Sequence, residues 1–256
     1  MEGITMEIGH KLMGEGASRV LVLHGWLDDH RVFEPMFDSL NLESFTYAFM
    51  DCRGYGRSRE LAGAYTMDEI AGDGFALAEK LGWDWFFVVG HCMGGMAAQH
   101  MVADNPDKVR AAALITSAPA SGMQFDEETW GLFHGAIDDP INRAGVIDYT
   151  TGSRLSATWL DAVSSRSIAN STREAVAGYL EAWTKTDFSA RVKGVAHRTL
   201  VLAGEHDAQI TPKLMNETIV AWNHRAEMDI LQNCGHYPML ETPVYLATVI
   251  ERFLNG

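Results

Sequence analysis

Short, uninterrupted apolar runs alternate with helical patterns along most of this 256-residue chain. The apolar runs are 19–25, 44–51, 85–90, 109–118, 197–204 and 226–235, and the helical patterns are 31–40, 66–82, 93–104, 212–222 and 242–254. Apolar runs without polar alternation are typical of strands buried on both faces, and helices between them are typical of a parallel sheet. The sequence therefore predicts an α/β protein with a mostly parallel, twisted sheet, helices on both faces and antiparallel edge strands within residues 3–13.

The alternation stops between residues 120 and 190. This segment is polar and helical in pattern, and its large aromatic residues are Trp130, Phe133, Trp159, Tyr179 and Trp183. Seventy residues without a strand pattern are too many for a loop, which indicates a helical insertion over one end of the sheet. We expect a core formed by residues 1–119 and 191–256, with residues 120–190 as a helical cap.

Composition excludes several classes of partner. The net charge of −14 at pH 7 argues against nucleic acid and against an anionic membrane surface. The sequence has no pattern typical of a secretion signal or of a membrane-spanning helix. Its three cysteines, Cys52, Cys92 and Cys234, are too few and too scattered for a disulfide framework, so we expect a cytoplasmic protein. A small molecule is the expected partner, and no feature of the sequence sets an oligomeric state.

The pattern Gly90-His91-Cys92-Met93-Gly94 joins an apolar run to a helix made of small residues. It matches the nucleophile elbow G-x-S-x-G, in which the central residue takes a strained conformation and glycines stand where a Cβ would clash. A buried thiol in an ordinary turn is the alternative, because free cysteine often behaves as a small hydrophobe. Five residues do not separate these two interpretations.

Two later loops supply the partners that a nucleophile needs. Asp207 follows the apolar run that ends at Gly204, and His236 follows the last apolar run. Nucleophile, acid and histidine in this chain order, each just past a strand, form the arrangement of a nucleophile, its base and an orienting carboxylate. The sequence therefore predicts a catalytic triad of Cys92, His236 and Asp207.

At this point the chain resembles the α/β-hydrolase fold superfamily, specifically a cap-bearing esterase or lactonase-like member, over essentially its full length. The matching segments are LHGW (23–26), DCRGYGRS (51–58), GHCMGG (90–95), GEHDAQITP (204–212) and CGHYPMLETP (234–243). They resemble the oxyanion loop, a D-x-R-G-x-G-x-S turn, the elbow, the acid loop and the histidine loop. The insertion falls where the family carries its cap. Cys92 departs from the serine of most members.

This resemblance implies a role for each matching residue. Cys92 attacks a carbonyl carbon to give a thioester, His236 moves the proton, and Asp207 holds the imidazole. The backbone N–H groups of Trp26 and Met93 form the oxyanion hole. The expected substrate contacts are His24, Trp26, Trp130 and Phe133. No metal and no organic cofactor are expected, because His24, Asp28, Asp29 and His30 suit a helix cap better than a metal site.

The predicted reaction is hydrolysis of a small to medium, largely apolar carboxylic ester or lactone. An acyltransferase or a carbon–carbon bond hydrolase would use the same triad, and a ligand-binding receptor would keep the fold without turnover. The segment GWLDDHRVF (25–33) also resembles cofactor-free quinolone dioxygenases, but their acid would fall at 116–120, where TSAPAS has no carboxylate. Cys92 itself has three explanations: a natural cysteine hydrolase, a natural acyltransferase, or an engineered replacement of a nucleophilic serine.

Overall fold

The computed structural model describes residues 7–256 and confirms the predicted fold class. Seven strands form one sheet in the order β1-β3-β2-β4-β5-β6-β7. The strands are β1 (His10–Met13), β2 (Ser18–Leu23), β3 (Phe45–Met50), β4 (Phe86–His91), β5 (Val109–Ile115), β6 (Thr199–Gly204) and β7 (Ala226–Leu231). Only β1 runs antiparallel, against β3; the other described pairs are parallel. The part of the predicted edge strands at residues 3–6 lies outside the described residues.

The strand register brings four loops to one edge of the sheet. Leu23 at the end of β2 pairs with Gly90 of β4, and Gly204 at the end of β6 pairs with Leu231 at the end of β7. The loops that carry Trp26, Cys92, Asp207 and His236 all leave the sheet at this edge. Every residue of β3, β4 and β6 is buried, as expected for strands covered on both faces.

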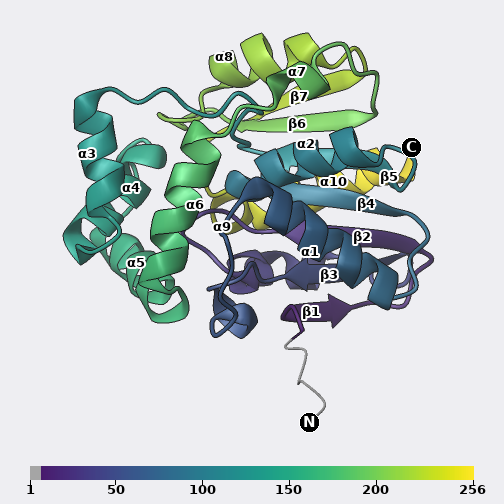
Figure 1. The fold of residues 1–256 in the computed structure, drawn as a ribbon, viewed down its shortest axis with the longest axis horizontal. Coiled ribbons are helices and arrows are strands. Elements are labelled where there is room, and N and C mark those ends of the chain that lie inside the picture. Colours follow the sequence, from purple (N-terminus) through teal and green to yellow (C-terminus); the bar gives the residue numbers. More distant parts are fainter. Residues whose placement is uncertain (1–6) are drawn as a thin grey trace.

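Helices cover both faces of the sheet. Figure 1 shows α1 (Met67–Lys80) and α2 (Met93–Asp104) in front of the strands and α10 (Pro243–Asn255) behind them. The 3-10 helix η1 (His30–Ser39) packs against α10. Thr66 caps α1 by accepting a hydrogen bond from the Glu69 N–H, as its Thr-x-x-Glu pattern predicts.

Three predicted helices differ from those in the structure. The pattern at 31–40 forms a 3-10 helix, which contains Pro35, a residue with no N–H to donate. The pattern at 212–222 divides into α8 (Pro212–Met215) and a π turn, η3 (Asn216–Val220). The last helix is preceded by a separate turn, α9 (Pro238–Glu241), because Pro243 disfavours a helical conformation at Thr242.

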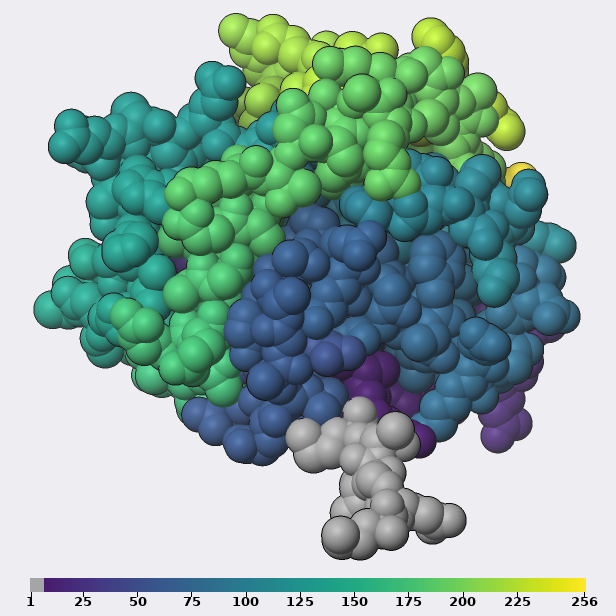
Figure 2. Space-filling view, in the orientation of Figure 1, coloured from purple at the N-terminus to yellow at the C-terminus, as the bar shows by residue number. Residues whose placement is uncertain are grey.

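Five helices lie between β5 and β6. They are α3 (Glu127–Gly135), α4 (Pro140–Thr150), α5 (Ala157–Asn170), α6 (Arg173–Lys185) and α7 (Ser189–Val192). Figure 1 shows α3 to α6 beside the end of the sheet at which α2 begins. In Figure 2 the green segment that contains α6 lies against the blue segment of α1, and these two helices are in contact. No helix within residues 7–256 combines the length and the apolarity that crossing a bilayer requires.

Candidate active site

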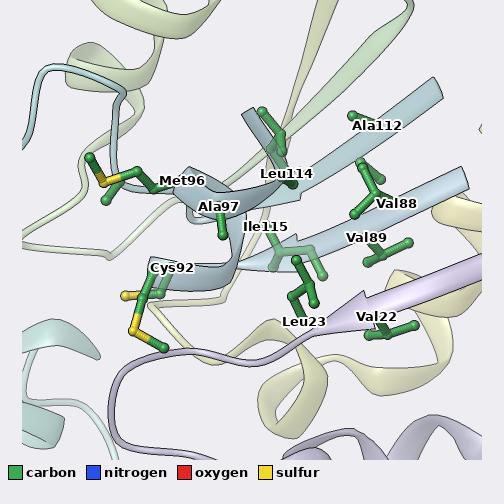
Figure 3. Packing of buried hydrophobic residues seen from close by; sticks show 14 of the residues in the cluster. Val22, Leu23, Val88, Val89, Cys92, Met96, Ala97, Ala112, Leu114 and Ile115 are labelled. Atoms are coloured by element: carbon green, nitrogen blue, oxygen red, sulfur yellow. The ribbon is translucent and has the colours of Figure 1, made fainter. Parts of the chain in front are cut away.

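The turn between β4 and α2 holds Cys92 in a strained conformation. Its φ of 52° and ψ of −115° lie in a region that residues with a side chain rarely adopt, at a cost on the order of 1–3 kcal/mol. A Cβ at Gly90 would stand 2.3 Å from the Gly94 carbonyl oxygen, and one at Gly94 would stand 2.6 Å from the Leu23 oxygen. Figure 3 shows Cys92 where the ribbon leaves β4 for α2. The turn therefore has the backbone of a nucleophile elbow.

Asp207 and His236 meet beside this turn. His236 Nδ1 lies 2.6 Å from Asp207 Oδ2, and both side chains are buried. Because a carboxylate only accepts, Nδ1 carries the proton and Nε2 is left to face other groups. The second carboxylate oxygen accepts hydrogen bonds from the backbone N–H groups of Gln209 and Ile210, at 2.9 and 2.8 Å. The Asp207 side chain is therefore held in one orientation.

The charges around His236 make its imidazole a stronger base. Burial opposes the charged imidazolium, but the negative charges of Asp207 and Cys92, and their hydrogen bonding to the ring, raise the pKa of His236 well above its ordinary value of 6.5. Cys92 and His236 line the same cavity, which is described below. The structure brings the three predicted residues together, and their catalytic roles are taken up below.

The two backbone groups predicted for the oxyanion hole are unengaged. Neither the Trp26 N–H nor the Met93 N–H donates a hydrogen bond to another residue within 7–256. The Tyr55 hydroxyl donates to the Trp26 carbonyl at 2.6 Å, and the Trp26 indole N–H donates to the Val176 carbonyl of α6 at 2.7 Å. The loop that carries Trp26 is thus fixed both by the turn after β3 and by the helical insertion. The predicted site did not include Tyr55, although it stands inside the DCRGYGRS motif.

A narrow, mostly apolar cavity lies above Cys92. Its walls are Trp26, Leu27, Asp28, Cys92, Phe133, Val146, Thr150, Trp183, Gln209, Ile210, His236 and Tyr237. The predicted contacts Trp26 and Phe133 do line it, and their rings stack 5.8 Å apart with 11° between their planes. Trp183 and Tyr237, which the predicted site omitted, complete the aromatic wall. Helices α3, α4 and α6 supply part of this lining, so the insertion shapes the cavity.

Two predicted substrate contacts do not line the cavity. His24 is fully buried, with one ring nitrogen 2.8 Å from the Gly25 oxygen and the other accepting from the Cys52 N–H at 3.0 Å. It shapes the loop instead. Trp130 is partly buried beside Phe125, with the Lys185 ammonium 4.6 Å from its ring centre. The reason is the same for both residues: protein groups outside the cavity wall already engage their side chains.

Comparison with known proteins agrees with the observed fold. A sequence model of the family described as alpha/beta hydrolase fold matches residues 18–136, which include the elbow. The chain has the α/β-hydrolase fold. A pimeloyl-[acyl-carrier protein] methyl ester esterase from Salmonella newport is 25% identical over 253 residues, covering 93% of this chain and 94% of that protein.

Solved structures resemble this protein closely in fold. An esterase from Exiguobacterium antarcticum superposes with a TM-score of 0.86 at 19% identity, covering 97% of this chain and 96% of the other. An enol-lactonase from Burkholderia xenovorans superposes with a TM-score of 0.84 at 21% identity, with the same coverage. At this level of identity the similarity concerns the fold.

Hydrogen bonds organise the loop that carries His236. Glu241 accepts from the backbone N–H groups of Gly235 and Tyr237, at 2.8 and 3.1 Å, and pairs with Arg154 at 3.1 Å. The His236 carbonyl accepts from the Thr116 hydroxyl at 3.0 Å. Thr116 therefore stands, as a hydroxyl, in the loop where a dioxygenase-like site would need its carboxylate.

Two groups of side chains have the residue types of a metal site. Asp29, His30 and Asp51 are buried together, but the Asp51 carboxylate already accepts from the His30 ring and from two backbone N–H groups. Asp29 caps η1 and pairs with Arg31. The second group is Asp68, His100 and Asp104, whose two carboxylates are exposed. Since these ligand atoms are engaged or solvated, neither group supports a metal assignment.

Proposed function

We propose that this α/β-hydrolase hydrolyses a small to medium, largely apolar carboxylic ester or lactone through a thioester on Cys92. One observation carries the proposal: Cys92, on a strained elbow, lies beside His236, whose Nδ1–H donates to a buried carboxylate. A nucleophile, a base in reach of it and a group that orients the base are the parts that nucleophilic catalysis needs. The aromatic and aliphatic walls of the cavity fit an apolar acyl or alcohol group.

In the first step Cys92 Sγ attacks the carbonyl carbon and its proton passes to His236 Nε2. The tetrahedral intermediate carries its negative charge on the former carbonyl oxygen, facing the N–H groups of Trp26 and Met93. Each such donor lowers the activation barrier by about 3 kcal/mol. Collapse breaks the carbon–oxygen bond to the alcohol, His236 returns the proton to the leaving oxygen, and an S-acyl thioester remains.

In the second step water attacks the thioester carbon. His236 takes a proton from the water as the hydroxide adds to the carbonyl. The carbon–sulfur bond then breaks, and the proton passes from His236 to the sulfur, which releases the acid and restores the Cys92 thiol. Asp207 stays ionised throughout and stabilises the imidazolium. The same residues would perform acyl transfer if an alcohol or an amine replaced the water.

The helical insertion acts as a cap in this proposal. Residues 120–190 would form the cap, and residues 1–119 and 191–256 the core. Support comes from the cavity walls, where Phe133 and Trp183 of the insertion face Cys92 of the core. The esterase and lactonase relatives support ester or lactone chemistry. All three cysteines are buried and unpaired, which fits the reducing cytoplasm that we propose as its compartment.

The test is the intact-protein mass after brief mixing with p-nitrophenyl butanoate and an acid quench, followed by peptide mapping. We expect a transient butanoyl adduct on the Cys92 peptide that disappears as butanoate is released. The peptides of Cys52 and Cys234 serve as internal controls, because these thiols are buried and burial raises the pKa of both.

Each other outcome assigns a different chemistry. An adduct that persists in water but leaves when an alcohol or amine is added identifies an acyltransferase. An adduct that persists in every case identifies a trap, as expected for a serine replaced by cysteine or for a receptor. If Cys92→Ser turns over the ester faster than the wild type, the site was built for serine. No adduct at Cys92 refutes the nucleophile assignment.

A further inference from the structure

Asp28 is a buried carboxyl group in the wall of the catalytic cavity, outside the triad. It follows Trp26 by two residues, is 7% exposed, and lines the cavity together with Cys92 and His236. Its Oδ2 is buried without a hydrogen-bond partner, and no described residue donates to its side chain. An unpartnered polar atom in a buried site costs about 1–3 kcal/mol. Such a group therefore calls for a functional explanation.

The neighbour of Asp28 fixes how this carboxyl group is protonated. His91 Nε2 lies 2.9 Å from the His236 carbonyl oxygen, and because a carbonyl only accepts, Nε2 carries the proton. Burial lowers the pKa of His91 well below its ordinary value, so the ring is neutral and Nδ1 presents a lone pair. This Nδ1, which also has no partner, faces Asp28 Oδ2 at 3.7 Å.

A carboxylate at this position would place two acceptors against each other. A protonated Asp28 instead directs its O–H at His91 Nδ1, and a small closure of the 3.7 Å gap satisfies both atoms. The surroundings of Asp28 also favour the protonated acid. Burial and the negative charge of Asp29 raise the pKa of Asp28 to about 7, although the positive charges of Arg166 and His236 oppose this shift. Arg166 makes no ion pair with Asp28 among the described residues.

Gly25 leaves the space for this contact. A Cβ at Gly25 would stand 2.6 Å from His91 Nδ1 and 3.2 Å from Asp28 Oδ2. A second unpartnered polar atom, the Trp183 indole N–H, belongs to another residue of the same cavity wall. By contrast, the Thr150 hydroxyl of this wall is engaged, since it donates to the Val146 carbonyl at 2.9 Å. Two residues of this apolar wall, Asp28 and Trp183, thus each have a buried polar atom that the protein itself does not satisfy.

We propose that Asp28 is a specificity-determining residue that, as a neutral acid bonded to His91, accepts a hydrogen bond from a hydroxyl or amide N–H of the substrate. With its O–H on His91 Nδ1, the acid has its other oxygen free to accept. This inference rests on the proposed ester hydrolysis and narrows it to esters or lactones that carry such a donor near the scissile carbonyl. A site built to bond a donor disfavours the analogue without it.

The test compares ethyl butanoate with ethyl 2- and 3-hydroxybutanoate, as both enantiomers, and with ethyl 3-methoxybutanoate, whose ether oxygen cannot donate. We expect kcat/KM for one of the hydroxy esters to be about tenfold higher than the values for ethyl butanoate and for ethyl 3-methoxybutanoate. Asp28→Leu should abolish this ratio. Asp28→Asn should keep it within about threefold, because the amide N–H donates to His91 and the amide oxygen accepts from the substrate. Asp84→Asn, in an exposed loop outside the cavity wall, is the control and should leave the ratio unchanged.

The same ligands are then titrated by calorimetry into Cys92→Ala, which removes the sulfur but not the subsite. Preferential binding of a hydroxy ester without turnover by the wild type would refute the proposed hydrolysis and keep the subsite. Turnover or binding with no hydroxyl preference would overturn the subsite and keep the hydrolysis. If Asp28→Asn loses the preference as fully as Asp28→Leu, an ionised carboxylate is required and the neutral acid is wrong.

Discussion

Replacing Asp207 by asparagine tests the triad through the orientation of one ring. Asp207 Oδ1 accepts from two backbone N–H groups, those of Gln209 and Ile210. An asparagine oxygen would keep these two bonds, so its NH2 group would face His236 Nδ1 at the 2.6 Å position. Nδ1 must then present a lone pair, which moves the ring proton to Nε2 on the side of Cys92. A protonated Nε2 cannot accept the thiol proton.

The magnitude follows from the charge that is lost. Asp207 and the imidazolium of His236 are both buried, and two unit charges about 4 Å apart at an effective dielectric constant near 20 attract by about 4 kcal/mol. At 1.36 kcal/mol per factor of ten, kcat/KM should fall about 10³-fold. The deficit should shrink as pH rises, because hydroxide then removes the thiol proton in place of His236.

The assay is p-nitrophenyl butanoate hydrolysis from pH 6 to 9, with the melting temperature as a check of folding. Asp84→Asn, in an exposed loop before β4, is the matched control and should keep wild-type kinetics. A loss smaller than about tenfold at pH 7 in a folded Asp207→Asn would refute the role assigned to the carboxylate. A pH-independent deficit would refute the tautomer argument.

Two stability measurements probe the elbow and the buried acid. Gly90→Ala places a Cβ 2.3 Å from a backbone oxygen and should lower the unfolding free energy by at least about 2 kcal/mol; Gly72→Ala, in open space on α1, should raise it by about 0.5–1 kcal/mol. Urea denaturation measures the unfolding free energy of both variants, and equal changes in the two would contradict the packing argument. The pKa of Asp28 is raised from 3.8 to about 7, so the folded state retains a proton that the unfolded state loses. The contribution of Asp28 to wild-type stability should therefore fall as pH rises from about 4 to 7. Asp28→Asn lacks this contribution, so its stability relative to the wild type should rise over this range, by up to about 4 kcal/mol. Parallel pH profiles of the two proteins would rule out the raised pKa.

The sequence by itself determined the fold and the order of the site loops. Buried strands need continuous apolar runs, and parallel strands need helices between them, so the pattern from β2 to β7 is readable without coordinates. The elbow was readable for a similar local reason: Gly90 is required by its contact with the Gly94 carbonyl within one short turn, although Gly94 itself is required by the carbonyl groups at the end of β2. Asp207 and His236 could be selected because each follows a strand at the edge where sites form.

Only the tertiary structure decided which side chains face the cavity. Trp130 and Phe133 lie one helical turn apart on α3, and the packing of that helix turns only Phe133 toward Cys92. His24 stands next to the oxyanion loop in sequence, yet its ring is taken by backbone groups. The local sequence pattern specifies whether a residue is apolar or polar. The direction in which its side chain points depends on how the helices of the insertion pack against the core.

The protonation of Asp28 is likewise decided only by the tertiary structure. In the sequence it is one acid of an Asp-Asp pair, and a helix cap accounts for either of them; in the structure Asp29 is the cap and Asp28 is buried. Its unusual state arises from His91, 63 positions away on β4, which is itself oriented by the carbonyl of His236 on a third loop. Burial and a lone pair facing the carboxyl group are properties of three segments meeting at one sheet edge, and no single segment encodes them.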